Sequence, residues 1–188
     1  PDLDRIRAHA EPLDDPKLRY PTIHVTGTNG KTTTARLAAA LACEHGLSTG
    51  LFTSPHLTSV TERFVVCGER MTEDEFGEEY ERLTPFLAAV DEHVGRVTYF
   101  EALTGLGYLW LADKPVDLGV FEVGMGGEWD ATNLIAGDVA VMSSTPSHRA
   151  RTPARRTIPR CSFICRVSWT VTSVPQRIFL RMGAPAML

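Results

Sequence analysis

Apolar residues in most of the chain fall into short runs separated by glycine- and proline-containing breaks. Runs rich in β-branched residues alternate with longer segments rich in alanine and leucine. This pattern predicts strands over residues 21–26, 50–53, 116–123 and 139–142, a hairpin over 60–71 with its turn at Cys67-Gly-Glu, and helices over 3–10, 31–45 and 100–112.

A further helix is marked by Thr72 and Glu75, which form a capping-box pattern, and we predict that it runs towards Pro85 or beyond. The run over 116–123 is almost continuously apolar, interrupted only by Asp117 and Glu122, which is typical of a strand buried on both faces. Because strands alternate with helices, we predict an α/β fold with a mostly parallel sheet and flanking helices.

The length and composition narrow the class of protein. The 188 residues are enough for one compact domain with a sizeable core. No apolar run reaches the roughly 18 residues that a membrane span needs, and no signal peptide opens the chain. Since the sequence begins at Pro1, we expect a fragment or a trimmed form. The cysteines are few and irregularly spaced, so we expect a reduced, cytoplasmic protein rather than a disulfide scaffold; they are Cys43, Cys67, Cys161 and Cys165.

Charge divides the chain into two unlike parts. Residues 1–138 hold all 23 acidic residues and 11 basic ones, a balance of −12, whereas residues 139–188 hold eight arginines and no Asp, Glu or Lys. From Ser143 the sequence is also crowded with serine, threonine and proline and has no helical or strand period. We interpret residues 143–188 as a frameshifted or disordered tail, and residues 1–142 as a partial domain. A basic tail that binds nucleic acid or anionic lipid, and a zinc site at His148, Cys161 and Cys165, are less favoured alternatives.

The strongest chemical motif is Gly27-Thr-Asn-Gly-Lys-Thr-Thr33, which lies between a predicted strand and a predicted helix. Glycines allow the backbone to turn tightly and to bring its N–H groups up to phosphate oxygens, and the helix adds its positive end at the same place. Lys31 supplies a cation for the β and γ phosphates, and the hydroxyl of Thr32 suits Mg²⁺. The alternative is an ordinary turn before a helix.

Further motifs follow the phosphate-binding motif in a fixed order: Thr53-Ser-Pro-His-Leu57, Glu62-Arg63, Thr98-Tyr-Phe-Glu101, Phe121-Glu-Val-Gly-Met-Gly-Gly127 and Asp130-Ala-Thr-Asn133. With the phosphate-binding motif, they resemble the folylpolyglutamate synthase/dihydrofolate synthase branch of the Mur ligase family over about residues 3–142. The resemblance is strongest to actinobacterial members. On this basis we interpret residues 1–142 as a partial ATP-binding domain. The resemblance implies an ATP- and Mg²⁺-dependent ligase that phosphorylates a carboxylate to an acyl phosphate, which the amine of L-glutamate attacks.

The resemblance also implies roles for individual residues. Lys31 and Glu122 would be catalytic, and the Mg²⁺ ligands would be Thr32, Ser54 and Glu122. Glu122 could instead form a salt bridge, Ser54 a turn cap, and Phe100 simple core packing. Arg63 is either a residue that faces the anionic end of the substrate or a solvated strand residue, and His56 receives no role. The ATP-binding residues would be Thr28, Asn29, Gly30, Lys31, Thr32 and Thr33, and the substrate-binding residues Thr98, Tyr99, Phe100, Glu101, Trp129, Asp130 and Ala131.

Some family features differ or are missing. Thr32 stands where many folate members have glycine, and Glu128 stands where arginine is common. A metal-binding Asp-His pair, a carbamylated lysine and the glutamate-ligase domain find no match after Met142. We therefore expect this chain by itself to be inactive or nearly so.

The expected substrates of the parent enzyme are ATP, folate or dihydropteroate, and L-glutamate, and we expect a monomer without nucleic-acid or membrane partners. The alternatives are another Mur ligase that acts on UDP-muramoyl precursors, and a nucleotide-binding remnant without catalysis.

Overall fold

The computed structural model describes residues 20–125, 130–135 and 137–143, together with the backbone of 171–172 and 179–180. The chain divides into two compact units, Pro1–Thr145 and Pro146–Leu188. In the second unit the described residues form two short antiparallel strands, β7 (Val171–Thr172) and β8 (Phe179–Leu180). The helix predicted over 3–10 lies outside the described residues. No helix in the described ranges is long and apolar enough to cross a membrane.

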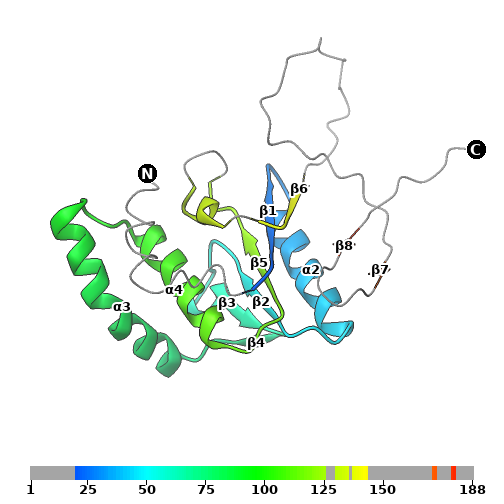
Figure 1. Cartoon of the computed structure of the whole chain (residues 1–188), viewed down its shortest axis with the longest axis horizontal. Helices are drawn as coiled ribbons and strands as arrows, with labels where there is room; N and C mark the ends of the chain where they lie inside the picture. The colour runs from blue at the N-terminus through cyan, green and yellow to red at the C-terminus, as the bar shows by residue number, and fades with distance from the viewer. Residues whose placement is uncertain (1–19, 126–129, 136, 144–170, 173–178, 181–188) are drawn as a thin grey trace, which may run out of the picture. The chain divides into compact units, whose positions relative to one another are not determined.

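A six-stranded sheet forms the centre of the first unit (Figure 1), with the strand order β4-β3-β2-β5-β1-β6. The four strands β2, β5, β1 and β6 run parallel, and β3 and β4 continue the sheet antiparallel beside β2. This confirms the predicted α/β fold with its mostly parallel sheet. The strands are β1 (Thr22–Gly27), β2 (Thr49–Phe52), β3 (Phe64–Val66), β4 (Glu69–Arg70), β5 (Leu118–Glu122) and β6 (Val139–Ser143).

Helices cover both faces of this sheet (Figure 1). On one face lies α2 (Lys31–Glu44), which turns the small residues Ala35 and Ala39 towards β1, β2 and β5. On the other face α4 (Tyr99–Asp113) packs against the sheet, and α3 (Glu73–His93) packs against α4. The predicted capping box at Thr72 and Glu75 is present and begins α3.

The central strand β5 is buried at all five positions, as predicted for a strand with both faces covered. Its alternate side chains face opposite layers. Phe121 lies on the α4 side, where its ring centroid is 5.2 Å from that of Tyr108 and 5.9 Å from that of Phe52. Glu122, the next residue, faces the α2 side, where it meets Thr32. The alternation therefore places the aromatic side chain of Phe121 in the core on one face of the sheet and the carboxylate of Glu122 on the other face.

Residues 60–63 differ from the sequence prediction. They form a short 3₁₀ helix, η3 (Val60–Arg63), instead of the first strand of a hairpin, so Arg63 is not a solvated strand residue. The reason is local, because the Ser59 side chain accepts from the backbone of the first turn while the Glu62 carboxylate accepts the Ser59 N–H at 3.2 Å. The hairpin proper begins at Phe64.

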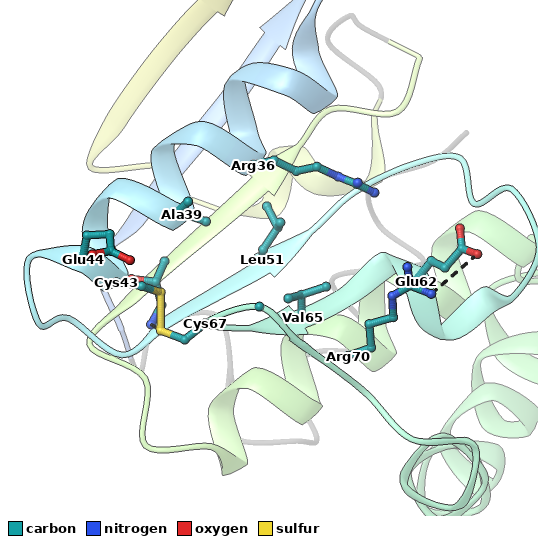
Figure 2. A pocket seen from close by; sticks show the side chains of 12 residues that line it. Arg36, Ala39, Cys43, Glu44, Leu51, Glu62, Val65, Cys67 and Arg70 are labelled. Carbon is teal, nitrogen blue, oxygen red and sulfur yellow. Dashed lines mark hydrogen bonds and ion pairs between the residues drawn. A yellow bond between two sulfur atoms is a disulfide. The ribbon is translucent and has the colours of Figure 1, made fainter.

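The expectation of reduced cysteines is wrong for Cys43 and Cys67, which form a disulfide. The bond joins the last turn of α2 to the turn between β3 and β4, and it lies at one end of an open hollow of about 360 Å³ between these elements (Figure 2). Sequence spacing did not predict the pair because the two residues meet only when α2 packs on the sheet with its last turn beside the turn between β3 and β4.

The disulfide closes a loop of 24 residues in sequence. Reduction should therefore lower the free energy of unfolding by about 3 kcal/mol, chiefly by releasing the unfolded chain. Urea unfolding with and without a phosphine reductant measures this difference. A Cys67→Ser variant should show no response to reductant at this site. The pairing is contradicted if the chain has the same free energy of unfolding with and without the reductant. It is also contradicted if thiol titration without reductant finds Cys43 and Cys67 free.

Candidate functional site

The candidate site lies where the carboxyl ends of the parallel strands meet. β1 ends at Gly27 and pairs with β5 on one side and β6 on the other, in a register that places Val25 beside Glu122 and Gly27 beside Ser143. β2, on the far side of β5, ends one residue before Thr53. In open α/β sheets this edge is where ligands bind, so the motif-bearing segments converge at a suitable place.

The phosphate-binding motif forms the turn from β1 into α2. Gly27 and Gly30 have φ angles of 142° and 74°, which favour glycine over other residues. Gly30 is the residue before the helix, and no side chain caps the helix there. Thr28, Asn29 and Gly30 are exposed. The first N–H groups of α2 are thus presented at the sheet edge, the arrangement that binds phosphate.

Lys31 is the first residue of α2, and its Nζ donates to the Gly27 carbonyl oxygen at 3.2 Å. This contact holds the half-buried ammonium group over the turn. An ammonium group has three donors, and this bond uses one of them. Lys31 is therefore placed to add positive charge beside the helix N-terminus.

Glu122 is the buried centre of the site, with 1% of its surface exposed. Its Oε1 accepts a hydrogen bond from the Thr32 hydroxyl at 2.7 Å, and its Oε2 accepts the Ser54 backbone N–H at 3.1 Å. Among the described residues it forms no ion pair, which removes the salt-bridge alternative within that part of the chain. One carboxylate thus brings together the three residues that the sequence analysis assigned to magnesium.

These groups suit Mg²⁺, which prefers oxygen ligands and commonly keeps waters and substrate phosphates in its shell. The Thr32 hydroxyl and the Glu122 carboxylate lie within 2.7 Å of each other, so one ion can contact both. In the described part of the chain no three His, Cys, Asp or Glu side chains cluster.

Ser143 supports the phosphate-binding turn and was not recognised from sequence. Its hydroxyl donates to the Asn29 carbonyl oxygen at 2.6 Å and lies 3.4 Å from the Thr34 hydroxyl. The sequence pattern puts Ser143 in the tail because the run of apolar residues ends at Met142. The only signal was its position directly after an apolar run, which is too weak to identify such a contact.

The segment between β2 and η3 is organised by Glu62. Its carboxylate accepts the backbone N–H groups of Leu57, Thr58 and Ser59 at 2.9–3.2 Å, together with the Thr58 hydroxyl. These bonds lower the pKa of Glu62 from 4.5 to about 2. The segment also contains a cis peptide bond between Ser54 and Pro55. Glu62 therefore holds the chain that presents Ser54 to Glu122.

The predicted substrate-binding residues at 98–101 begin α4. The backbone N–H of Thr98 donates to the Glu101 carboxylate at 2.7 Å, so these two residues form a capping box. Phe100 is half-buried, with its ring centroid 6.3 Å from that of Phe52, and it contributes to the core. Tyr99 is 62% exposed, which leaves its ring accessible to a ligand.

Asp130 and Ala131, also predicted to bind substrate, are buried at the start of the short 3₁₀ helix η4 (Ala131–Leu134). The Asp130 carboxylate accepts the backbone N–H and the hydroxyl of Thr132 at 3.0 and 2.6 Å, and the Met125 N–H at 2.9 Å.

The Thr132 hydroxyl in turn lies 2.7 Å from Nε2 of His24. Burial lowers the pKa of His24, and Asp130 raises it to a smaller extent. Asp130 thus shapes its own loop. Trp129 lies outside the described residues.

Gly27 offers a direct test of how tightly the turn packs. A Cβ atom at this position would lie 1.8 Å from the Ser143 carbonyl oxygen. Gly27→Ala should therefore lower the free energy of unfolding by roughly 2–4 kcal/mol. The matched control is Gly77→Ala within α3, where no atom lies within 4 Å of the new Cβ and a gain of about 0.5–1 kcal/mol is expected. Equal stability of the two variants in urea unfolding would contradict the packing.

Glu62 predicts a pH dependence. Because its folded-state pKa lies below its ordinary value of 4.5, its contribution to stability is complete above about pH 4.5 and is lost as the pH falls towards 2. In Glu62→Gln, part of the acid sensitivity over this range should therefore disappear. Urea unfolding of both proteins between pH 2 and 7 measures it, with Glu78→Gln on the exposed surface of α3 as control. Parallel pH curves for the chain and Glu62→Gln would refute the role of Glu62.

Comparison with known proteins agrees with this geometry. The chain is 41% identical over 151 residues to the dihydrofolate synthase/folylpolyglutamate synthase of Mycobacterium tuberculosis, a match that covers 76% of the chain and 31% of the relative. It is 32% identical to the Bacillus subtilis protein of that name, over 77% of the chain and 34% of the relative. The chain thus spans about one third of the length of these relatives. No protein-family model matches it.

Solved structures give the same result for the fold. M. tuberculosis folylpolyglutamate synthase complexed with ADP superposes with a TM-score of 0.73 at 42% identity, covering 74% of this chain and 32% of that one. An FPGS–AMPPCP–folate complex superposes with a TM-score of 0.71 at 34% identity, covering 75% and 35%. By sequence and by fold, the chain is a homologue of the folylpolyglutamate synthase/dihydrofolate synthase enzymes of the Mur ligase family, matched over part of their length.

Proposed function

We propose that this chain provides the ATP- and magnesium-binding core of a ligase that joins L-glutamate to folate or dihydropteroate. The observation that carries the proposal is the convergence of Thr32 and Ser54 on the buried carboxylate of Glu122. Lys31 lies over the adjacent turn, where its ammonium group contacts the Gly27 carbonyl oxygen. Relatives with this fold have been solved with ADP and with AMPPCP and folate, which supports both classes of ligand. The names of the relatives favour folates over UDP-muramoyl precursors as the acceptor.

The geometry supports separate roles for the residues that bind the phosphates and the residues that bind the metal. The N–H groups of residues 28–33 and the Lys31 ammonium bind the β and γ phosphates, which lie at the N-terminus of α2. Thr32, Ser54 and Glu122 would hold magnesium at the same edge of the sheet. When bound, the ion neutralises charge on the phosphate oxygens. The Lys31 ammonium can turn from the Gly27 carbonyl oxygen to a phosphate oxygen, because it would lose only one hydrogen bond to the backbone.

The reaction that this arrangement serves has two steps. An oxygen of the acceptor carboxylate forms a bond to the γ phosphorus while the bond from that phosphorus to ADP breaks, giving an acyl phosphate. The amine of glutamate then attacks the acyl carbon, and inorganic phosphate leaves as the amine loses a proton. Positively charged groups at the sheet edge stabilise the phosphoryl group in transfer.

The acceptor contacts that we propose come from the start of α4 and the loop around η4. The exposed ring of Tyr99 suits stacking on a flat heterocycle, and Trp129, Asp130 and Ala131 would line the same ligand. We assign a structural role to three of these side chains because they hydrogen-bond to the backbone and hold the loops in place: Thr98, Glu101 and Asp130. Phe100 supports the site mainly from the core.

The extent of the match limits what is assigned to these 188 residues. They correspond to about one third of the relatives, so we assign to them nucleotide binding, metal binding and part of the acceptor site. Glutamate binding belongs, in this proposal, to parts of the relatives that the match does not include. The monomeric state and the cytoplasmic location stay predictions.

Binding of Mg·AMPPCP tests the proposal. Saturating ligand should stabilise the chain, by about 2.7 kcal/mol at a hundred times the dissociation constant. Lys31→Ala should lose most of this effect. Glu122→Gln should lose the magnesium-dependent part alone, and Glu78→Gln, a matched change on α3, should behave as the unchanged chain. Thermal unfolding and calorimetric titration, with and without chelator, measure these effects. Full magnesium-dependent stabilisation of Glu122→Gln would exclude the proposed site.

A further inference from the structure

Arg63 is a buried cation whose hydrogen bonds are incomplete. Its side chain belongs to the last residue of η3, and only 6% of the residue is exposed. Its Nε–H donates to Nδ1 of His56 at 2.9 Å, whereas its Nη1 is buried and has no hydrogen-bond partner among the described residues. A guanidinium group is always protonated, so this unpaired N–H group carries part of a full positive charge.

Leaving such a group unpaired in the protein interior is unfavourable, because its interactions with water are lost and nothing replaces them. Burial lowers the pKa of Arg63, while the neighbouring Tyr99 and Glu122 raise it. Glu122 does not satisfy the guanidinium directly, because no ion pair within 4.0 Å joins the two among the described residues and the carboxylate is engaged by Thr32 and Ser54. The charge is therefore available for an anion that is not part of the described chain.

The backbone holds Arg63 in this position. The Arg63 carbonyl oxygen accepts the Thr53 N–H at 3.0 Å, which ties the end of η3 to the residue after β2. The Ser59 and Glu62 capping box fixes the start of the same short helix. Since Nδ1 of His56 accepts the Arg63 Nε–H, a neutral His56 carries its proton on Nε2. The position of the guanidinium group is thus fixed by the backbone bond to Thr53 and by the bond from Nε to His56. Nη1 keeps its hydrogen-bonding capacity for a ligand.

We propose that Arg63 binds the carboxylate of the pterin-containing acceptor and retains the same group as it becomes an acyl phosphate, an inference that rests on the proposed function. Two sources of negative charge reach this region, the nucleotide γ phosphate and the acceptor carboxylate. The nucleotide already has Lys31 and the N-terminus of α2. Arg63 comes from the other segment, between β2 and β3, and its electrostatic neighbours are Glu122 and the exposed Tyr99 of the proposed acceptor site. A planar guanidinium also matches a carboxylate better than an ammonium does.

Paired ligands and paired variants test this assignment. Pteroate and its neutral carboxamide differ at the carboxylate, and each is titrated into the 188-residue chain, with and without Mg·AMPPCP. Arg63→Gln should weaken the binding of pteroate by roughly ten- to a hundredfold, which is the loss of a charge-assisted hydrogen bond. The affinities for the carboxamide and for Mg·AMPPCP should stay within about twofold of the unchanged chain. Arg96→Gln, at an exposed position, should change none of them.

Other results of the same titrations would overturn the proposal. Equal losses for pteroate and its carboxamide would show that Arg63 acts only on the structure, and a loss confined to Mg·AMPPCP would assign it to the nucleotide. If Arg63→Gln fails to fold by circular dichroism, Arg63→Lys decides: it keeps the charge without the fork, and a loss of about threefold or more for pteroate alone is expected.

Binding by the unchanged chain distinguishes a failure of the proposed function from a failure of the proposed role of Arg63. If it binds neither Mg·AMPPCP nor pteroate, the proposed function fails, and the role of Arg63 fails with it. If it binds both and Arg63→Gln binds both equally well, only the role of Arg63 is refuted.

Discussion

The site depends on the buried carboxylate of Glu122, which is the last residue of β5. Burying an ionised carboxylate is unfavourable unless donors surround it, and here the donors come from two other elements, the Thr32 hydroxyl of α2 and the Ser54 N–H after β2. One side chain thus links the phosphate-binding helix and the segment after β2 at the sheet edge. If the carboxylate is moved or removed, both partners lose their common anchor.

The rest of the fold keeps this carboxylate in place. Because β5 is buried on both faces, alternation puts Phe121 into the aromatic core on the α4 side and Glu122 on the α2 side. Small residues on α2, Ala35 and Ala39, let the helix approach the sheet. The contacts of Glu62 with the backbone of residues 57–59 hold the opposite segment. Nucleotide-side and acceptor-side groups therefore reach the same edge from separate elements.

Local patterns were sufficient to predict much of this arrangement. The alternation of strands and helices, the turn at 27–33 and the strand ending near Glu122 all depend on spacing within a short window. Parallel strands then bring the motifs to one edge, so the meeting of Thr32, Ser54 and Glu122 follows from where each residue stands at the end of its strand or the start of its helix. The capping boxes at Thr72 and Thr98 are local in the same sense, although we recognised only the first.

Features that depend on distant packing could not be predicted. The Cys43–Cys67 bond requires the last turn of α2 to lie beside the turn between β3 and β4, and the hydrogen bond from Ser143 to Asn29 spans 114 residues. The sequence leaves Arg63 between two roles because its burial depends on how η3 packs, and the hairpin predicted over 60–71 implied a strand at this position. In each case the missing information is a tertiary contact rather than a residue preference.

The most direct measurement is a crystal structure of the chain with AMPPCP and Mn²⁺ in place of Mg²⁺, using the anomalous signal to locate the metal. We predict a peak within coordination distance, about 2.0–2.3 Å, of the Thr32 hydroxyl and a Glu122 carboxylate oxygen. Phosphate oxygens should complete the shell, and Lys31 should have turned from Gly27 to a phosphate. A metal bound elsewhere, or a triphosphate that lies away from the 27–33 turn, would contradict it.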